Sequence, residues 1–274
     1  LTRADPATMG NSGGPIVFDQ DGPEIYATIF TIAPSRRDTA TIWTGSDDGL
    51  VHVTRDGGRT WRNVTPPDLR PDTRVSRIDP SWHNAGAAYV AAERHQMDDR
   101  APYIWKTRDY GATWTKTTGG LGEGDFVRVV REDRVRPGLL FAGTEHGVRV
   151  SFDDGGHWQS LSRNLPDVQV SDLVVEERDL VIATHGRSFW VLDDLSALRQ
   201  VTPAMLANDA RAVGLLRPAT VVGRTASANI HYYLPRSSDS VAVEILDEHG
   251  GRVRTLGGAA KSAGMHRVRW DLRY

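Results

Sequence analysis

Short stretches of alternating apolar and polar residues recur along about the first 200 residues of the chain. The clearest are GLVHVTRD at 49–56, PYIWKTRD at 102–109 and GVRVSFDD at 147–154. Two shorter apolar stretches precede each one, at 26–35 and 41–46, at 74–81 and 87–94, and at 125–133 and 138–145. A fourth stretch follows each one and starts at a Trp. Because a period of two places alternate side chains on opposite faces of a strand, this pattern predicts units of four antiparallel strands.

One octapeptide occurs at the same point of three units. It reads TRDGGRTW at 54–61, TRDYGATW at 107–114 and SFDDGGHW at 151–158. The aspartates at 56, 109 and 153 are 53 and then 44 residues apart, which is the length of one four-stranded propeller blade. A fourth unit begins with VSDLVVEERD at 170–179, and its octapeptide is no longer recognisable.

The octapeptide, called the Asp-box below, is explained by turn geometry. Its Asp can accept backbone N–H groups in a tight turn between the third and fourth strands. Its Gly supplies a positive φ, and its Trp can fill the wedge between neighbouring blades. We therefore predict structural roles, and not general-acid roles, for Asp56, Gly58, Trp61, Asp109, Gly111, Trp114, Asp153, Gly155 and Trp158.

These boxes resemble the Asp-box (BNR) repeats of sialidases, of two-propeller xyloglucanase-type glycoside hydrolases and of sortilin (VPS10) receptors. The stretches GSDDGLVHVTRDGGRTW, GDFVRVVRED and GTEHGVRVSFDDGGHWQSL read most like bacterial glycosyl-hydrolase-like chains, whose propeller is similar to that of sortilin. The resemblance covers about residues 1–200 and implies an all-β fold. We expect a partial β-propeller of about four four-stranded blades at 1–203, the C-terminal part of a larger propeller.

The pattern changes after residue 200. We predict a linker at 204–228 and then, at 229–274, an incomplete β-sandwich that resembles the FlgD-type Ig-like domain. Its strands are predicted at 230–235, 241–250, 251–257 and 264–274, with a hairpin turn at 249–251. The resemblance implies a spacing or docking role for this part.

Four blades are too few to close a propeller of this kind. We therefore expect unpaired sheet edges, and we expect the remaining propeller blades of the same protein as partners. For the same reason, this 274-residue chain by itself should be oligomeric or prone to aggregation.

Composition narrows the classes of function. The net charge of −2 gives no electrostatic reason to expect nucleic acid or an anionic membrane as a partner. The chain has no Cys, which excludes disulfides, thiolate metal sites and Cys nucleophiles. No apolar run approaches the roughly 20 residues of a membrane span. We expect no cofactor and no metal, because the His and carboxylate residues lack a short ligand spacing such as HExxH.

The segment GNSGGPIV at 10–17 resembles the nucleophile loop of chymotrypsin-like proteases, with Ser12 as the nucleophile. In that fold a full barrel carrying the His and Asp precedes the Ser. Only eleven residues precede Ser12, and blades follow it. A Gly- and Pro-rich loop between blades is the favoured interpretation.

Blade geometry indicates where a ligand would bind. The turn between the second and third strands and the connection between blades share one face, opposite the Asp-boxes. Short turns such as GSDDG also suit ordinary hairpins, but the loop ERHQMDDRAP at 93–102 is longer than a hairpin needs. The polar residues of this face are Asp47, Asp48, Glu93, Arg94, His95, Asp98, Asp99, Glu123, Asp125, Glu145, His146, His185 and Arg187.

Two functions remain open. In the first, a secreted glycosyl-hydrolase-like propeller binds or cleaves glycans on this face, with Asp98, Asp99 and Asp125 as catalytic candidates. Its ligand-binding candidates are Arg94, His95, Glu123, Glu145, His146, His185 and Arg187. In the second, a non-catalytic, sortilin-like propeller binds a protein or peptide there.

The match to known enzymes is incomplete. A sialidase would carry an Arg-Ile-Pro strand and an arginine triad, and neither is recognisable in this sequence. A xyloglucanase-type enzyme needs one carboxylate from each of two propellers. We therefore expect this chain by itself to be inactive, and we expect an extracellular or periplasmic location.

Overall fold

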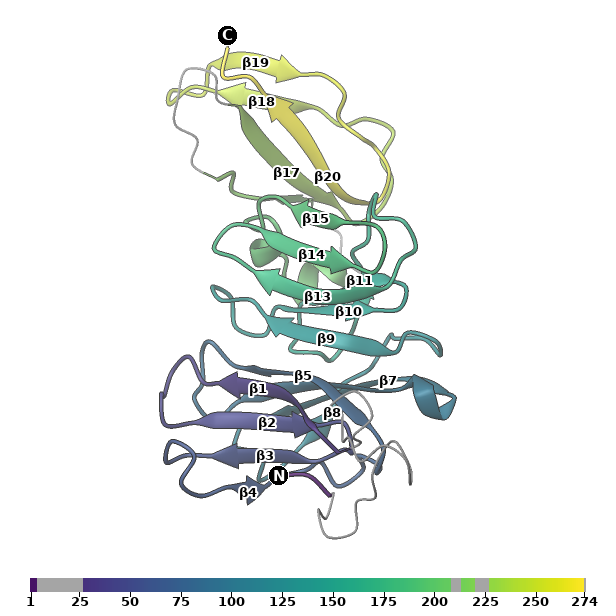
Figure 1. Cartoon of the computed structure of the whole chain (residues 1–274). Coiled ribbons are helices and arrows are strands. Elements are labelled where there is room, and N and C mark those ends of the chain that lie inside the picture. The colour runs from purple at the N-terminus through teal and green to yellow at the C-terminus, as the bar shows by residue number, and fades with distance from the viewer. Residues whose placement is uncertain (4–26, 208–212, 220–226, 274) are drawn as a thin grey trace. The chain divides into compact units, whose positions relative to one another are not determined.

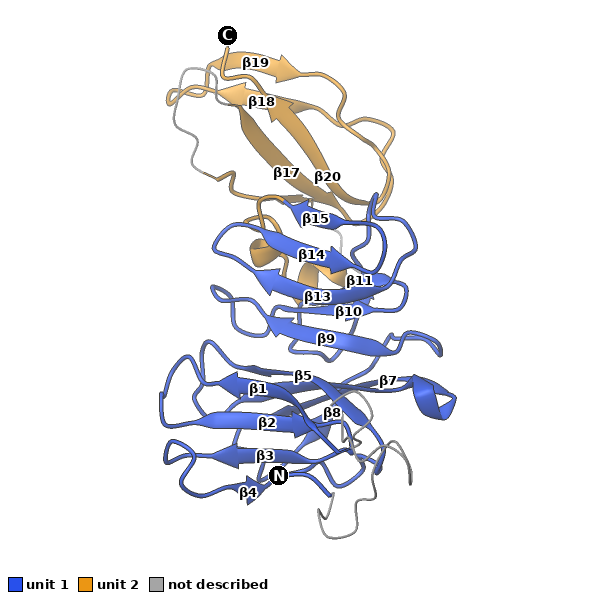
Figure 2. Cartoon of the chain, in the orientation of Figure 1, with its two compact units in different colours: residues 1–192 blue, residues 193–274 orange. Residues whose placement is uncertain are grey.

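A computed structural model describes residues 1–3, 27–207, 213–219 and 227–273. The described chain is built almost wholly of β-strands (Figure 1). It divides into two compact units, Leu1–Leu192 and Asp193–Tyr274, which Figure 2 shows in different colours. Ser12 and the rest of the segment 10–17 lie outside the described residues.

Unit 1 is an all-β partial propeller of four consecutive antiparallel blades. The first blade has the order β1(Ile29–Pro34), β2(Ile42–Ser46), β3(Val51–Thr54) and β4(Arg62–Asn63). The second has the order β5(Arg74–Pro80), β6(Ala88–Arg94), β7(Asp99–Thr107) and β8(Thr115–Lys116). The third has the order β9(Val127–Glu132), β10(Leu140–Thr144), β11(Gly147–Ser151) and β12(Gln159–Ser160). The fourth contains β13(Val170–Val175), β14(Leu180–Thr184) and β15(Phe189–Leu192).

The inner strand of every blade carries a β-bulge near its start. In the first blade, for example, Ile29 pairs with Ser46 and Thr31 with Gly45, so one residue is left without a cross-strand partner. The bulged residues of the four blades are Phe30, Ser76, Arg128 and Ser171. A bulge redirects the side chains around it. This repeated irregularity therefore decides which side chains of the inner strands leave the apolar core.

The core of unit 1 lies between successive blades. Trp43 and Val53 of the first blade belong to one buried cluster with Ile78 and Trp105 of the second. A further cluster joins the second and third blades through Tyr89, Ala91, Ile104, Val127, Val130, Leu140, Ala142 and Trp158. Burial of these apolar faces is the main force that holds consecutive sheets together.

The Asp-box carboxylates accept hydrogen bonds from within their own turns. Asp109 accepts the backbone N–H and the hydroxyl of Thr113 at 2.9 and 2.6 Å, while Thr107 binds the same carboxylate at 2.8 Å. The Thr107 hydroxyl also accepts the N–H of Gly111 at 3.0 Å. Asp56 repeats this pattern, and Asp153 repeats it without the second hydroxyl, because His157 donates only its backbone N–H. The bonds from Thr113 and Thr107 lower the pKa of Asp109 to about 2, so this carboxylate is a hydrogen-bond acceptor and not a proton donor.

The box tryptophans fill the wedge between blades. Trp158 is buried, and its Nε1 donates to the carbonyl of Thr117 in the preceding blade at 3.0 Å. Trp114 donates in the same way to Val64 at 2.7 Å. Trp61, whose blade follows no described blade, is only half-buried. Trp114 is also half-buried, although it contacts the preceding blade.

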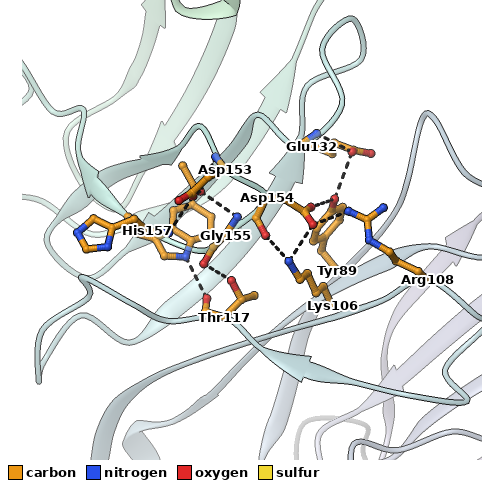
Figure 3. Close-up of polar contacts among 12 residues, drawn as sticks. Tyr89, Lys106, Arg108, Thr117, Glu132, Asp153, Asp154, Gly155 and His157 are labelled. Atoms are coloured by element: carbon orange, nitrogen blue, oxygen red, sulfur yellow. Dashed lines mark hydrogen bonds and ion pairs between the residues drawn. The ribbon is translucent and has the colours of Figure 1, made fainter. Parts of the chain in front are cut away.

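The third box adds a polar contact to this wedge. Figure 3 shows Asp154, the residue after the box Asp, between Tyr89 and Lys106 of the second blade, at 2.7 and 2.8 Å. Burial raises the pKa of the Tyr89 phenol, and the carboxylate of Glu132 raises it further, so Tyr89 stays a donor. Burial opposes the charge of Asp154, but the hydrogen bonds from Lys106 and Tyr89 prevail and lower its pKa.

Ion pairs also link the inner strands across blade boundaries. Asp79 of β5, whose side chain is 1% exposed, pairs with Arg36 at 3.1 Å and with Arg131 of β9 at 3.3 Å. Arg131 continues to Asp172 of β13 at 2.9 Å, and Asp172 also pairs with Arg77 at 2.7 Å. All four blades thus contribute to one chain of charges.

Unit 2 contains two small antiparallel sheets. Its strands are β16(Gly214–Leu215), β17(Ala228–Leu234), β18(Val243–Leu246), β19(Arg252–Leu256) and β20(Gly264–Trp270). Strand β17 pairs with β16 and β20, and β18 pairs with β19 across a turn at 247–251, close to the predicted hairpin. The segment predicted as a linker, 204–228, therefore supplies an edge strand, because β16 pairs with β17. The described residues include no helix long and apolar enough to span a membrane.

Candidate functional site

The two ends of the blades differ in their loops. The end with the Asp-boxes is called the box face below. The other end, called the loop face, carries the turns between the second and third strands at 47–50, 95–98, 145–146 and 185–188. Because neighbouring strands are antiparallel, these turns lie at the opposite end of each sheet from the box hairpins. The sequence-predicted binding residues are on the loop face.

Glu93, at the end of β6, is the centre of the loop-face cluster. Its side chain is 3% exposed, and three cationic or ionisable groups surround it. Arg74 of β5 lies 3.4 Å from one carboxylate oxygen, while Arg128 of β9 and Nδ1 of His95 each lie 3.1 Å from the other. A buried carboxylate is tolerated only where such partners compensate for its lost hydration. These four residues, called the channel-mouth cluster below, join the second and third blades.

Aromatic rings flank the channel-mouth cluster. The ring of His95 stacks on Phe126 with a centroid distance of 5.0 Å, and the Arg128 guanidinium lies 5.0 Å from the same Phe126 ring. The guanidinium of Arg74 lies 4.9 Å from the ring of Phe30, which is half exposed. A hollow of about 80 Å³ opens here. Its lining is formed by Asp47, Asp72, Arg74, Glu93, Arg94, His95, Gln96 and Met97.

Asp99, a catalytic candidate, is held by its neighbours. It accepts the phenol of Tyr103 at 2.8 Å, and it pairs with Arg94 at 3.3 Å and with Arg70. Burial opposes its charge, but the bonds from Tyr103 and Ala101 and the charges of Arg70 and Arg94 prevail and lower its pKa. The group is therefore an ion-pair acceptor and not a proton donor. Asp98, beside it, is exposed and caps a single 3-10 turn with a φ of 55°.

Asp125, the third catalytic candidate, is buried and faces Arg149 of β11. One guanidinium nitrogen of Arg149 lies 2.8 and 2.9 Å from its two oxygens. Arg94 is positioned in a similar way, because Thr73 accepts its guanidinium at 3.0 Å and Asp99 faces its Nε. These charges hold the loops of the second and third blades in place.

The remaining predicted residues are spread over the loop face. Glu145 lies 3.7 Å from Arg128 and so touches the channel-mouth cluster. His146 pairs with Asp167 at 2.9 Å, and Asp47 accepts the N–H of Thr28 at 2.8 Å. Asp48 is buried and accepts the Ser46 hydroxyl, whereas Glu123 is exposed. His185 and Arg187 are on the exposed turn of the fourth blade, and no ion pair of the described residues joins them to the cluster.

Sequence reasoning included Arg94 but missed Arg74, Arg128 and the aromatic rings of the site. Arg74 and Arg128 are on inner strands, whereas the prediction considered only loops. A signal was present, because RVSRIDP and FVRVVRED place Arg within otherwise apolar inner strands. Arg128 is also the bulged residue of β9, which explains why it leaves the core.

A second hollow, of about 290 Å³, lies on the box face. There Trp82 lies under the guanidinium of Arg36 at 4.3 Å and of Arg134 at 5.0 Å. Arg36 also donates to the carbonyl of Pro80 at 2.7 Å and pairs with Asp79. These arginines bind groups of the protein itself. Their contacts therefore stabilise the blades around the second hollow. Among the described residues, no group of three or more His, Asp or Glu could hold a metal ion.

Comparison with known proteins adds one domain match. Residues 219–273 match the FlgD Ig-like domain. A protein of Corynebacterium efficiens named phosphoenolpyruvate carboxylase is 26% identical over 276 residues, which cover 93% of this chain and 26% of that protein. The chain thus spans about a quarter of the length of that relative.

Partial structural similarity is found with several solved proteins. The GH74 enzyme of Niastella koreensis aligns with a TM-score of 0.46 and 15% identity over 86% of this chain and 29% of its own. YCF48 from Cyanidioschyzon merolae aligns with a TM-score of 0.41 and 15% identity over 90% of this chain and 83% of its own. The GH74 xyloglucanase of Xanthomonas campestris aligns with a TM-score of 0.43 and 16% identity over 71% of this chain and 32% of its own.

Proposed function

We propose that this protein is a glycan-binding propeller of the glycosyl-hydrolase-like Asp-box group, and that the glycan binds at the channel-mouth cluster. The observation that supports this most is the convergence of Arg74, Arg128 and His95 on Glu93 beside the exposed ring of Phe30. Fixed hydrogen-bonding groups next to an aromatic wall are what a sugar ring needs, because its hydroxyls are polar and its ring face is apolar.

Binding fits the site better than cleavage. A glycoside hydrolase needs a carboxylic acid whose raised pKa keeps its proton at neutral pH. Asp99 has a lowered pKa, and Asp125 faces Arg149 at 2.8 Å. Both groups therefore serve to orient arginines. The channel mouth supplies binding groups, and hydrolysis would need an acid other than Asp99 and Asp125.

Peptide binding in the manner of sortilin is the second candidate. Met97, at the hollow, is 53% exposed, and the ring of Phe30 is 51% exposed. An apolar peptide side chain would use such groups, and an arginine could pair with a peptide carboxylate. For either ligand we propose a periplasmic or extracellular location, where polymeric glycans and foreign peptides are met.

Paired variants of the whole chain test the site. In the test variant Arg74→Gln is combined with His95→Ala, which leaves Arg128 to neutralise Glu93. The control is Arg59→Ala, an exposed arginine within the first Asp-box on the opposite face. We expect the test variant to weaken binding at least tenfold, about 1.4 kcal/mol, and the control to leave it unchanged.

Binding would be measured by calorimetry against a panel of neutral and acidic oligosaccharides and against short peptides. Weakened binding of a sugar supports the glycan proposal, and weakened binding of peptides alone replaces it with the second candidate. Unchanged affinities, with a native circular dichroism spectrum, would remove the channel mouth as the ligand site.

A further inference from the structure

The arginines of the channel mouth are already paired with carboxylates of the protein. Arg74 and Arg128 both donate to Oε1 of Glu93, at 3.4 and 3.3 Å. Arg94 pairs with Asp99 at 3.3 Å. A ligand carboxylate is bound most strongly by a guanidinium that can direct two N–H groups at it. Here those N–H groups already face acceptors of the protein itself.

Glu93 contributes most to this compensation of charge. It is buried at the boundary between the second and third blades, where one carboxylate meets guanidiniums from β5 and β9. Among the polar partners that the structure describes, removal of Glu93 would leave Arg74 with the amide of Gln96 at 3.1 Å. It would leave Arg128 with the more distant Glu145, at 3.7 Å. The sign of the charge that a ligand meets here therefore depends on Glu93.

The charge around the hollow of about 80 Å³ is not positive. Its described lining contains the carboxylates of Asp47, Asp72 and Glu93 against the guanidiniums of Arg74 and Arg94. Asp72 is exposed. An incoming carboxylate would therefore meet exposed negative charge, and like charges that face each other across an interface oppose binding.

A neutral sugar meets more favourable conditions in the same hollow. A hydroxyl both donates and accepts hydrogen bonds, whereas a carboxylate only accepts them. The lining offers donors from Arg74 and Arg94 and acceptors from Asp47 and Asp72. The exposed ring of Phe30 lies beside Arg74 and can contact the apolar face of a sugar ring.

We propose that Glu93 makes the channel mouth selective for neutral sugars over sugars that carry a carboxylate. This inference rests on the glycan site proposed above and names the class of its ligand. Glu93 acts through Arg74 and Arg128, whose charge it neutralises and which would otherwise attract an acidic sugar. It is a specificity-determining residue and not a catalytic one.

The test compares sugars that differ only in charge. Each neutral oligosaccharide of the panel is measured by calorimetry beside the same sugar with its primary hydroxyls oxidised to carboxylates. Each acidic oligosaccharide is measured beside its methyl ester. We expect the whole chain to bind the neutral member of a pair about tenfold more tightly than the acidic member.

Glu93→Gln should reverse or remove this preference. The substitution keeps the size of the side chain and one acceptor oxygen, but it leaves the charges of Arg74 and Arg128 uncompensated. The ratio of the two affinities should therefore move about tenfold toward the acidic sugar. A merely structural role of Glu93 would weaken both sugars alike and leave the ratio unchanged.

Asp72→Asn is a second variant that leaves the buried carboxylate in place. Asp72 has a φ of 60°, and Asn tolerates this left-handed conformation. Loss of its charge should move the ratio in the same direction. The matched control is Glu176→Gln, which removes the same charge from an exposed carboxylate beside Arg134 on the box face. The control should keep the ratio of the parent.

The outcomes separate this inference from the function on which it rests. A parent chain that prefers acidic sugars, or an unchanged ratio in Glu93→Gln, overturns the role of Glu93 and leaves a glycan site in place. Absence of binding to every sugar overturns the proposed function and this inference together. If Glu93→Gln loses the native circular dichroism spectrum, the ratio in Asp72→Asn decides. A shift in both variants of the hollow, and none in the control, supports the proposal.

Discussion

The Ser or Thr that starts each Asp-box holds the turn together with the aspartate. Thr107 donates to Asp109 and accepts the N–H of Gly111, so one hydroxyl fixes both ends of the turn. Ser151 does the same in the third box. A Cβ on Gly111 would lie 2.6 Å from Cβ of Val64, so this glycine is required both by its φ of 76° and by the preceding blade.

At this scale we expect Asp109→Ala to cost about 1–2 kcal/mol in free energy of unfolding, because three accepted hydrogen bonds are lost from an exposed turn. Ligand binding should stay unchanged, since the loop face is at the other end of the blade. Urea unfolding and binding calorimetry measure the two effects. A variant that unfolds like the parent yet loses ligand binding would contradict the structural role. Glu123→Ala, at an exposed loop residue, is the control.

At the scale of the blade, neighbouring sheets stabilise one another through the box tryptophans. Trp158 is 2% exposed within the cluster between the second and third blades, whereas Trp61 occupies the same box position and is half-buried. The two residues are chemically identical. Trp114, which has a preceding blade, is also half-buried, so burial of the box Trp depends on how closely the preceding blade packs on it.

We expect Trp158→Ala to lower the free energy of unfolding by about 3–5 kcal/mol, as is usual when a buried aromatic is truncated. Trp61→Ala, the matched control, should cost clearly less. Both are measured by urea unfolding. Equal losses at the two positions would show that the wedge contact contributes little.

At the scale of the whole molecule, carboxylates with lowered pKa values make the free energy of unfolding decrease at low pH. The folded pKa of Asp109 is about 2 against an ordinary value of 3.8, because Thr113 and Thr107 donate to its charged form. Asp56, Asp99 and Asp154 are also lowered. A carboxyl with a depressed folded pKa contributes stability that is present above its unfolded pKa and lost as pH falls toward the folded one.

We therefore expect the free energy of unfolding to fall steeply between about pH 4 and pH 2. Asp109→Asn removes one titrating group, so its loss over this interval should be smaller than that of the parent. Urea unfolding at a series of pH values from 7 to 2 measures both. A parallel fall in the two proteins would mean that the box bonds do not favour the charged form.

Part of the candidate site was predictable from the sequence. Glu93, Arg94, His95 and Asp99 belong to the segment 93–102, which the sequence predicts as a long loop. In the structure β6 ends at Arg94 and β7 begins at Asp99, so only 95–98 form the turn. The sequence did not indicate that Asp99 would pair with Arg70, 29 residues away, or Asp125 with Arg149, 24 residues away. A residue type in a loop suggests chemistry, but its pKa depends on neighbours that are distant in sequence.

The sequence by itself determined the blades, the four-strand order of the first three and the Asp-box turns. Each of these depends on contacts within a few residues, such as the bond from Thr113 to Asp109, and adjacent residues encode such contacts directly. Only the tertiary structure decided which polar groups meet at the channel mouth. Arg74 and Glu93 are 19 residues apart and Arg128 a further 35, and they meet because bulged inner strands and stacked sheets bring them to one point. That register is fixed by the packing of whole blades, which no local pattern records.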